Sequence, residues 1–147
     1  MRIAIGANHS GYLVRGMLIE MIGRLPHEVV DLGVFDSHPV DYPEIAAGVA
    51  ERVAAGQVDR GILIGGTGLG MCIAANKVAG VRAVPCHDVM TAQFSRLHND
   101  SNVLCLSASL LGDSLIRHIV ETWLKTPFEG GRHQRRVDKI AQLESTW

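Results

Sequence analysis

Short apolar runs alternate along the chain with longer segments in which apolar residues recur every three or four positions. A short apolar run bounded by turn residues is typical of a buried strand, and the wider spacing is typical of a helix with one buried face. The runs predict five strands, at residues 2–5, 28–33, 61–64, 81–86 and 102–107. The longer segments predict helices at residues 12–24, 42–55, 71–78, 89–98, about 111–125 and 137 to about 144.

This alternation of strands and helices predicts an α/β fold with a five-stranded parallel sheet and helices on both faces, a three-layer, doubly wound (Rossmann-like) arrangement. In such folds ligands bind beyond the carboxyl ends of the strands, so the polar residues after the first, third and fourth strands are the first candidates for a site. Residues from about 126 to 147 have no strand, and we interpret them as a C-terminal helical arm that could pack against a second subunit. No linker interrupts residues 1–147, and we expect one domain.

Composition narrows the possible functions. The 147 residues are 47% hydrophobic and 20% charged, as in ordinary globular proteins, and the formal net charge of −1 gives no reason to expect a nucleic acid or membrane partner. The three cysteines are widely spaced without a CxxC pair, so we expect neither a disulfide framework nor a metal site. The apolar run at the N-terminus is too short for a secretory signal, and we expect a cytoplasmic protein.

A glycine-rich turn, GGTGLG at residues 65–70, joins the third strand to the third helix. A dinucleotide fingerprint would read GxGxxG after the first strand, and a Walker loop would continue into GK[ST], so the sequence favours neither. Main-chain N–H groups at such a turn suit phosphate, a carboxylate or an enediolate oxyanion, and the Thr67 hydroxyl could contact the same anion. For this turn taken alone, a purely structural role stays the alternative.

Two further groups of polar residues could carry chemistry. Asn8, His9 and Ser10 follow the first strand, where a ligand is expected. His98 and Asn99 close the fourth helix, and a histidine there could either cap the helix or donate a proton.

Arginines form a dense basic cluster before the last predicted helix. Arg132, Arg135 and Arg136 oppose the dipole of that helix, which an anion nearby would compensate. Because a guanidinium fork suits phosphate, the cluster is a candidate phosphate site, although a solvated helix start is the simpler interpretation.

Together these segments resemble one family, that of ribose-5-phosphate isomerase type B and the galactose-6-phosphate isomerase subunits. The resemblance covers nearly the whole chain. It rests on IGANHSGY (5–12), DYPEIA (41–46), GGTGLG followed by IAANK (65–77), GVRAV (80–84), RLHND (96–100) and EGGRHQRRV (129–137).

The resemblance implies a cofactor-free aldose–ketose isomerase that acts on a phosphorylated sugar through an enediol, in dimers or tetramers with active sites at the subunit interface. It makes His98 the proton donor that opens the sugar ring and places Thr67 near the ring oxygen. It also implies that Arg132 and Arg136 bind the phosphate. The residues that it implies for substrate binding are Asn8, His9, Gly66, Gly68, Leu69, Gly70, Asn99, Arg132 and Arg136.

This sequence departs from the family pattern where the chemistry is expected. The usual general base is a cysteine at the position of Gly65, and another branch has a glutamate at the position of Met71. The customary aspartate before the first histidine is Asn8, and a common phosphate-binding arginine is replaced by Ser109.

Cys72 is the substitute base that we favour among the residues near this turn. It lies in the first turn of the third helix, where free amides and the helix dipole favour a thiolate, although a buried structural cysteine is the commoner outcome. Asp41 is a weaker candidate, and Cys86 could contact a ligand. We therefore expect an isomerase with an atypical base and altered sugar preference, the alternative being a sugar-phosphate-binding protein without turnover.

Overall fold

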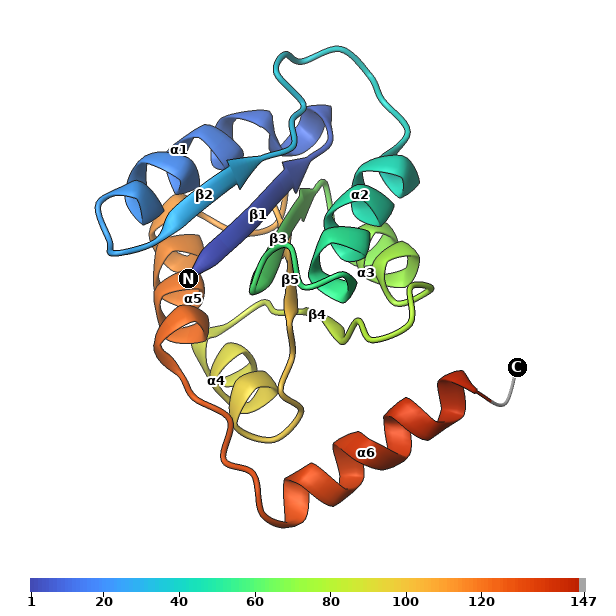
Figure 1. Cartoon of the computed structure of the whole chain (residues 1–147). Coiled ribbons are helices and arrows are strands. Elements are labelled where there is room, and N and C mark those ends of the chain that lie inside the picture. Colours follow the sequence, from blue (N-terminus) through green and yellow to red (C-terminus); the bar gives the residue numbers. More distant parts are fainter. Residues whose placement is uncertain (146–147) are drawn as a thin grey trace.

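The computed structural model describes residues 1–145 and contains one sheet of five parallel strands in the order β2-β1-β3-β5-β4 (Figure 1). Six α-helices accompany it in the described part of the chain, so the predicted fold class is confirmed. The strands are β1 (Arg2–Ala7), β2 (Glu28–Asp31), β3 (Arg60–Gly65), β4 (Ala83–Pro85) and β5 (Val103–Ser107). The α-helices are α1 (Tyr12–Gly23), α2 (Tyr42–Ala54), α3 (Leu69–Ala75), α4 (Val89–Leu97), α5 (Asp113–Lys125) and α6 (Arg132–Glu144).

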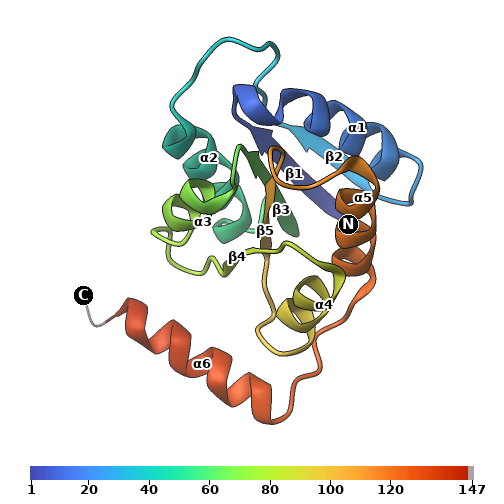
Figure 2. The same ribbon diagram turned by 180° about the vertical axis from the view of Figure 1, so that it is seen from behind.

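Both faces of the sheet are covered, which explains why the central strands are continuous apolar runs. On one face α1, α4 and α5 bury Leu18, Ala92 and Trp123 against β1, β3 and β5. On the other face α2 and α3 bury Val49 and Met71 against the same strands. Figures 1 and 2 show these layers from opposite sides. No described helix is long and apolar enough to cross a membrane.

Two elements differ from their predicted bounds. The fourth strand is only Ala83–Pro85, because the side chain of Asn102 accepts a hydrogen bond from the Arg82 amide (2.7 Å) and ends the pairing there. The last helix begins at Arg132 instead of Val137, directly after Gly131. The arginines are therefore inside the first turns of α6.

The direction of the strands decides where each loop lies. Since all five strands are parallel, the turns after β1 and β3 lie at the carboxyl edge of the sheet, whereas residues 98–102, which precede β5, lie at the amino edge. The arm α6 also leaves from the amino edge (Figures 1 and 2), and its His133 and Val137 side chains are buried. Near its end the Gly80 amide donates a hydrogen bond to Glu144 Oε1 (2.8 Å).

Candidate active site

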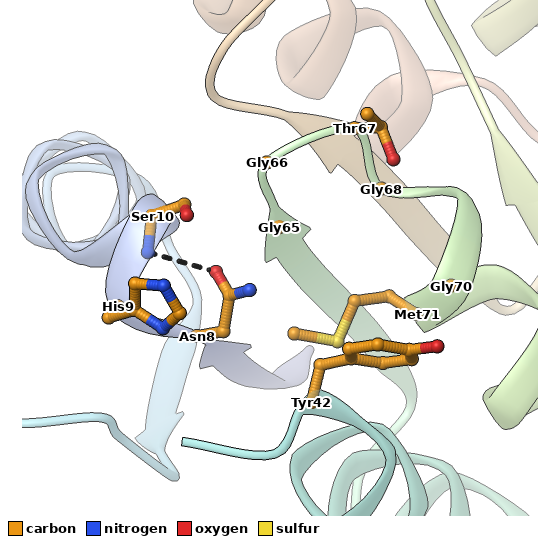
Figure 3. Close-up of a pocket in the computed structure, with 10 residues that line it drawn as sticks. All are labelled: Asn8, His9, Ser10, Tyr42, Gly65, Gly66, Thr67, Gly68, Gly70 and Met71. Carbon is orange, nitrogen blue, oxygen red and sulfur yellow. Dashed lines mark hydrogen bonds between the residues drawn. The ribbon is translucent and has the colours of Figure 1, made fainter. Parts of the chain in front are cut away.

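A pocket of about 250 Å³ opens at the carboxyl edge, between the turns that follow β1 and β3 (Figure 3). It is lined by Asn8, His9, Ser10, Tyr42, Gly65, Gly66, Thr67, Gly68, Gly70 and Met71. The prediction of a site beyond the carboxyl ends of the strands therefore has a cavity to support it.

The glycine turn has its shape because two of its residues admit no side chain. Gly68 has φ 77°, and a β-carbon there would lie 2.8 Å from the carbonyl oxygen of Leu106. A β-carbon on Gly70 would lie 2.6 Å from the ring of Tyr42. These close approaches hold the turn against β5 and α2, and the first amides of α3 are left without carbonyl partners in their own helix.

Hydrogen bonds from the strand β5 and the loop after it fix the other side of the turn. The Ser107 hydroxyl donates to the carbonyl oxygen of Gly66 (2.7 Å), and the Ser109 amide donates to the same oxygen (3.0 Å). Thr67 is exposed, and its Oγ1 accepts a hydrogen bond from the Leu69 amide (3.3 Å). The carbonyl groups are thus turned toward β5 and its loop, which is the arrangement expected if the amides are to receive an anion.

The turn after β1 brings the first polar group to the same pocket. Asn8 Oδ1 accepts a hydrogen bond from the Ser10 amide (3.0 Å), and the Asn8 amide donates to the Ile64 carbonyl on β3 (3.1 Å). Figure 3 shows Asn8, His9 and Ser10 across the pocket from the glycine turn. Where the family has a carboxylate, the pocket therefore has a neutral amide whose oxygen already accepts a backbone hydrogen bond.

The floor of the pocket is apolar. A β-carbon on Gly65 would lie 3.3 Å from Cγ of Met71, so the Met71 side chain fills the space beside this glycine. Met71 is 2% exposed. The Met71 side chain thus lies at both positions where the resemblance implies a base, and the titratable side chains in the pocket lining are those of His9 and Tyr42.

Cys72 is not part of the pocket lining. Its Sγ lies 3.4 Å from the Ala83 carbonyl oxygen and 3.5 Å from Asn76 Nδ2, where α3 packs toward β4. A hydrogen bond with the buried thiol of Cys105 lowers the pKa of Cys72 to about 7, and Asn76 contributes in the same direction. With this pKa, Cys72 can ionise near neutral pH. However, consecutive side chains on a helix point about 100° apart, and Met71 is the one that lines the pocket. The geometry gives no support to Cys72 as the base.

The other predicted site residues, His98, Asn99, Arg132 and Arg136, lie at the amino edge. His98 ends α4, where its backbone amide donates to the Phe94 carbonyl (2.9 Å). Asn99, Arg132 and Arg136 are exposed, and Asn99 borders a separate hollow with Phe94. The predicted site residues thus form two groups at opposite edges of the sheet, and one chain does not bring them together.

Three residues escaped prediction as site residues. Tyr42 lines the pocket, and the DYPEIA segment signalled it, but only its aspartate was considered. Glu129 Oε2 lies 3.8 Å from His98 Nε2, and the His133 ring stacks on the His98 ring. The i, i+4 spacing of Glu129 and His133 in EGGRH was an available signal.

Comparison with known proteins decides the family. The model of the Ribose/Galactose Isomerase family matches residues 3–140. The chain belongs to this family. The family indicated by the sequence motifs is therefore confirmed.

Several relatives match over their full length. Ribose-5-phosphate isomerase B of Escherichia coli is 46% identical over 143 residues, covering 97% of this chain and 96% of that protein. A putative sugar phosphate isomerase of Bacillus subtilis is also 46% identical, covering 98% of this chain and 97% of that protein.

Solved structures share the fold of this chain. Ribose-5-phosphate isomerase B of Clostridium thermocellum superposes with a TM-score of 0.98 at 46% identity, covering 99% of both chains. That of Mycoplasma genitalium with bound ribulose-5-phosphate has a TM-score of 0.95 at 43% identity, covering 99% of this chain and 97% of that one.

Proposed function

We propose that this protein is an aldose–ketose isomerase of a phosphorylated sugar, of the ribose 5-phosphate/ribulose 5-phosphate type or a related four- to six-carbon sugar, and that two copies of the chain build each active site. The observation that carries the proposal is the division of the family's site motifs between the two edges of one sheet. A second copy, placed so that its amino edge faces the pocket, would unite them.

In the united site each part has a distinct task. Arg132 and Arg136 of one copy bind the phosphate, with His9 of the other copy beside them. His98 donates the proton that opens the sugar ring, near Thr67. The amides of residues 66–70 hold the oxyanion that develops when the carbon-bound proton leaves, and they need no reorganisation to do so.

The base is the weak part of this enzyme. A positioned base contributes roughly 10²–10⁴ to a rate. The pocket lining offers His9 and Tyr42 but no carboxylate or thiol, so we expect turnover well below that of a relative with a cysteine or glutamate base. The same observation favours the second candidate function, a sugar-phosphate-binding protein without turnover.

Solvent hydrogen exchange separates the two functions. In deuterium oxide an isomerase incorporates deuterium at the carbon next to the carbonyl and converts an aldose phosphate to its ketose, whereas a binding protein does neither. We expect slow conversion of at least one member of a panel of four- to six-carbon sugar phosphates. Saturable binding by calorimetry without exchange for any of them would contradict the isomerase and leave the binding function.

Mixing two variants tests whether the site is shared. Gly66→Val blocks the pocket of one copy and His98→Asn disables the amino edge of the other. A heterodimer of the two has one site built entirely from unchanged parts, so an equimolar mixture should regain about a quarter of wild-type activity by random pairing. Two inactive variants that remain inactive after mixing and verified subunit exchange would contradict a shared site.

A further inference from the structure

The ring of His98 is enclosed by side chains that the proposed function does not use. The Phe94 ring stacks on it with centroids 4.9 Å apart, and the His133 ring stacks on it at 4.2 Å with planes 10° apart. Glu129 approaches both imidazoles at their Nε2 atoms, each 3.8 Å from Glu129 Oε2.

The EGGRH segment is built to produce this arrangement. The Glu129 amide donates to the Leu97 carbonyl (3.1 Å), which holds Glu129 beside the end of α4. Gly130 and Gly131 have φ of 70° and 55°, a backbone that other residues rarely adopt, although a β-carbon on either would meet no atom within 4 Å. The two glycines are thus required by conformation and not by space. They turn the chain so that His133, four residues after Glu129, comes back onto His98.

Burial and the neighbouring charges both affect the pKa of His133. Burial lowers the pKa of His133, the neighbouring His98 lowers it further, and Arg132 and Arg136 act in the same direction against Glu129. His133 is 4% exposed, and its Nε2 has no hydrogen-bond partner in the described chain. These effects favour the uncharged form of the His133 ring.

The donor atoms of these three side chains lie within 4.8 Å of one another, which raises the question of a metal ion. An imidazole lone pair lies in the plane of its ring, and the two rings are stacked with planes 10° apart and centroids 4.2 Å apart, so a single ion would lie out of the plane of at least one ring, which does not suit Zn²⁺ ligation. The geometry instead fits a carboxylate beside two imidazole N–H groups. Glu129 Oε2 would accept a hydrogen bond from an imidazole Nε2–H if their distance of 3.8 Å shortened by less than an ångström.

We propose that Glu129 and His133 are positioning residues for His98: Glu129 holds the Nε2–H, His133 provides a flat seat for the ring, and Nδ1 is left to exchange a proton with the sugar. No group in residues 1–145 hydrogen-bonds His98 Nδ1, and the ring keeps about a third of its side-chain surface exposed, at 36%. The hydrogen bond on one imidazole nitrogen sets the state of the other, as a carboxylate does in hydrolase triads.

This inference rests on the proposed function, because ring opening is one of its steps. The doubly protonated ring of His98 gives its Nδ1 proton to the ring oxygen as the bond from that oxygen to C1 breaks. The C1 hydroxyl proton passes to water and a C1 carbonyl forms, so no electrons are gained or lost. His98 keeps its Nε2–H toward Glu129 and regains the Nδ1 proton from solvent.

A pair of substrates isolates that step. Ribose 5-phosphate is a closed furanose, whereas ribulose 5-phosphate cannot close a five-membered ring because O5 carries the phosphate. Exchange of solvent deuterium into C1 of the ketose therefore needs the base and the oxyanion site but no ring opening. A positioning role predicts that Glu129→Gln slows conversion of the aldose about tenfold or more while ketose exchange changes less than about twofold.

The stacking role of His133 is tested by two substitutions that keep or remove a flat ring at this position. His133→Phe keeps a stacked ring and should retain at least about half of the aldose conversion, whereas His133→Ala should behave like Glu129→Gln. Asp138→Asn, which removes an exposed carboxylate on the same helix, is the matched control and should change neither rate. Equal losses of aldose conversion and ketose exchange in Glu129→Gln would overturn the proposal.

A second readout does not depend on activity. The ¹⁵N shifts of the His98 ring should identify an Nε2–H tautomer in the wild type, and Glu129→Gln should change them, whereas Asp138→Asn should not. Unchanged shifts in Glu129→Gln would overturn the positioning role even in an active enzyme. Changed shifts in a protein that converts no sugar would uphold it while the proposed isomerase fails. Stoichiometric Zn²⁺ binding that Glu129→Gln abolishes would overturn it in favour of a metal centre.

Discussion

The two edges of the sheet carry different kinds of chemistry. At the carboxyl edge the pocket is made from backbone, glycines and small polar side chains, and close packing against Leu106 and Tyr42 holds it in place. At the amino edge the groups are charged or titratable side chains, displayed on a helix end and on an arm that stands clear of the sheet (Figure 1). The pocket lined by backbone and the surface that carries histidines and arginines thus lie at opposite edges of the sheet.

In one copy of the chain, the fold therefore separates the residues of the proposed site into two groups. Parallel strands send every strand end to one edge, so the turns after β1 and β3 lie at the edge opposite to His98, which precedes β5. In the proposed function a second copy of the chain joins the two edges.

The largest effect is expected at the pocket floor. Met71→Glu places a carboxylate beside Gly65 and should raise the isomerisation rate about a hundredfold, because it supplies a base that the pocket lacks. Met71→Gln has nearly the same shape without the acid–base function and should give no increase. Rates are compared by coupled assay of ketose formation, after circular dichroism has verified the fold. A rate that Met71→Glu leaves unchanged would mean that a competent base is already present.

The arginines of the amino edge should come next. Arg132→Ala and Arg136→Ala each remove a charged donor to phosphate and should weaken sugar-phosphate binding about ten- to a hundredfold. Arg135→Ala, exposed on the same helix but not implied in binding, should lower affinity less than about twofold. Isothermal titration at fixed salt measures all three. Equal losses for the three variants would indicate a diffuse electrostatic surface and not a site.

Breaking the glycine turn should have a smaller effect that shows in stability. Gly68→Ala sets a methyl group 2.8 Å from a backbone oxygen and also strains a backbone with φ 77°, whereas Gly80→Ala meets the strain alone, at φ 82°. We expect the free energy of unfolding to fall about 1–3 kcal/mol further in Gly68→Ala than in Gly80→Ala. Urea unfolding monitored by fluorescence measures the difference. Equal destabilisation would mean that the turn can move away from Leu106.

A pH effect on stability should follow from His133. Its pKa is lowered in the folded chain from the ordinary 6.5, so the unfolded chain takes up the proton first as the pH falls. The stability contributed by the neutral ring is therefore present above about pH 6.5 and is lost as the pH falls below it. His133→Phe should flatten this part of the dependence of unfolding free energy on pH. A curve between pH 7 and 5 that keeps its slope in the variant would assign the dependence to other groups.

The smallest effect is expected for Cys72. Because its Sγ lies against the Ala83 carbonyl and outside the pocket lining, Cys72→Ala should leave turnover within about twofold of wild type. A Cys105→Ala variant serves as the control for loss of a neighbouring thiol. A loss of more than about tenfold in Cys72→Ala alone would reinstate this thiol as the base.

Much of the fold followed from local patterns. The apolar runs located the five strands because each central strand is buried on both faces, and the helical spacing located the helices to within a few residues. The start of α6 was missed because arginines at a helix start are unfavourable in isolation, whereas here Gly131 fixes the boundary.

The site was predicted only in part. The glycine turn and Asn8-His9-Ser10 follow strands and were placed correctly at the pocket. His98 precedes β5, so the direction of the strands already placed it at the edge opposite to the pocket. The sequence motifs nevertheless assigned it to the same site as the residues of the pocket. The contacts of Glu129 and of Met71 depend on residues far along the chain or on side-chain direction, which spacing does not encode.

The contact between Gly65 and Met71 also restricts the mutational paths open to this chain. A cysteine introduced at position 65 would place its β-carbon 3.3 Å from Cγ of Met71 and would compete with that side chain for the same space. With Met71 in place, that side chain has to shift by a few tenths of an ångström, whereas a shorter residue 71 would leave the space free. A thiol at position 65 should therefore be accommodated more easily when residue 71 is smaller.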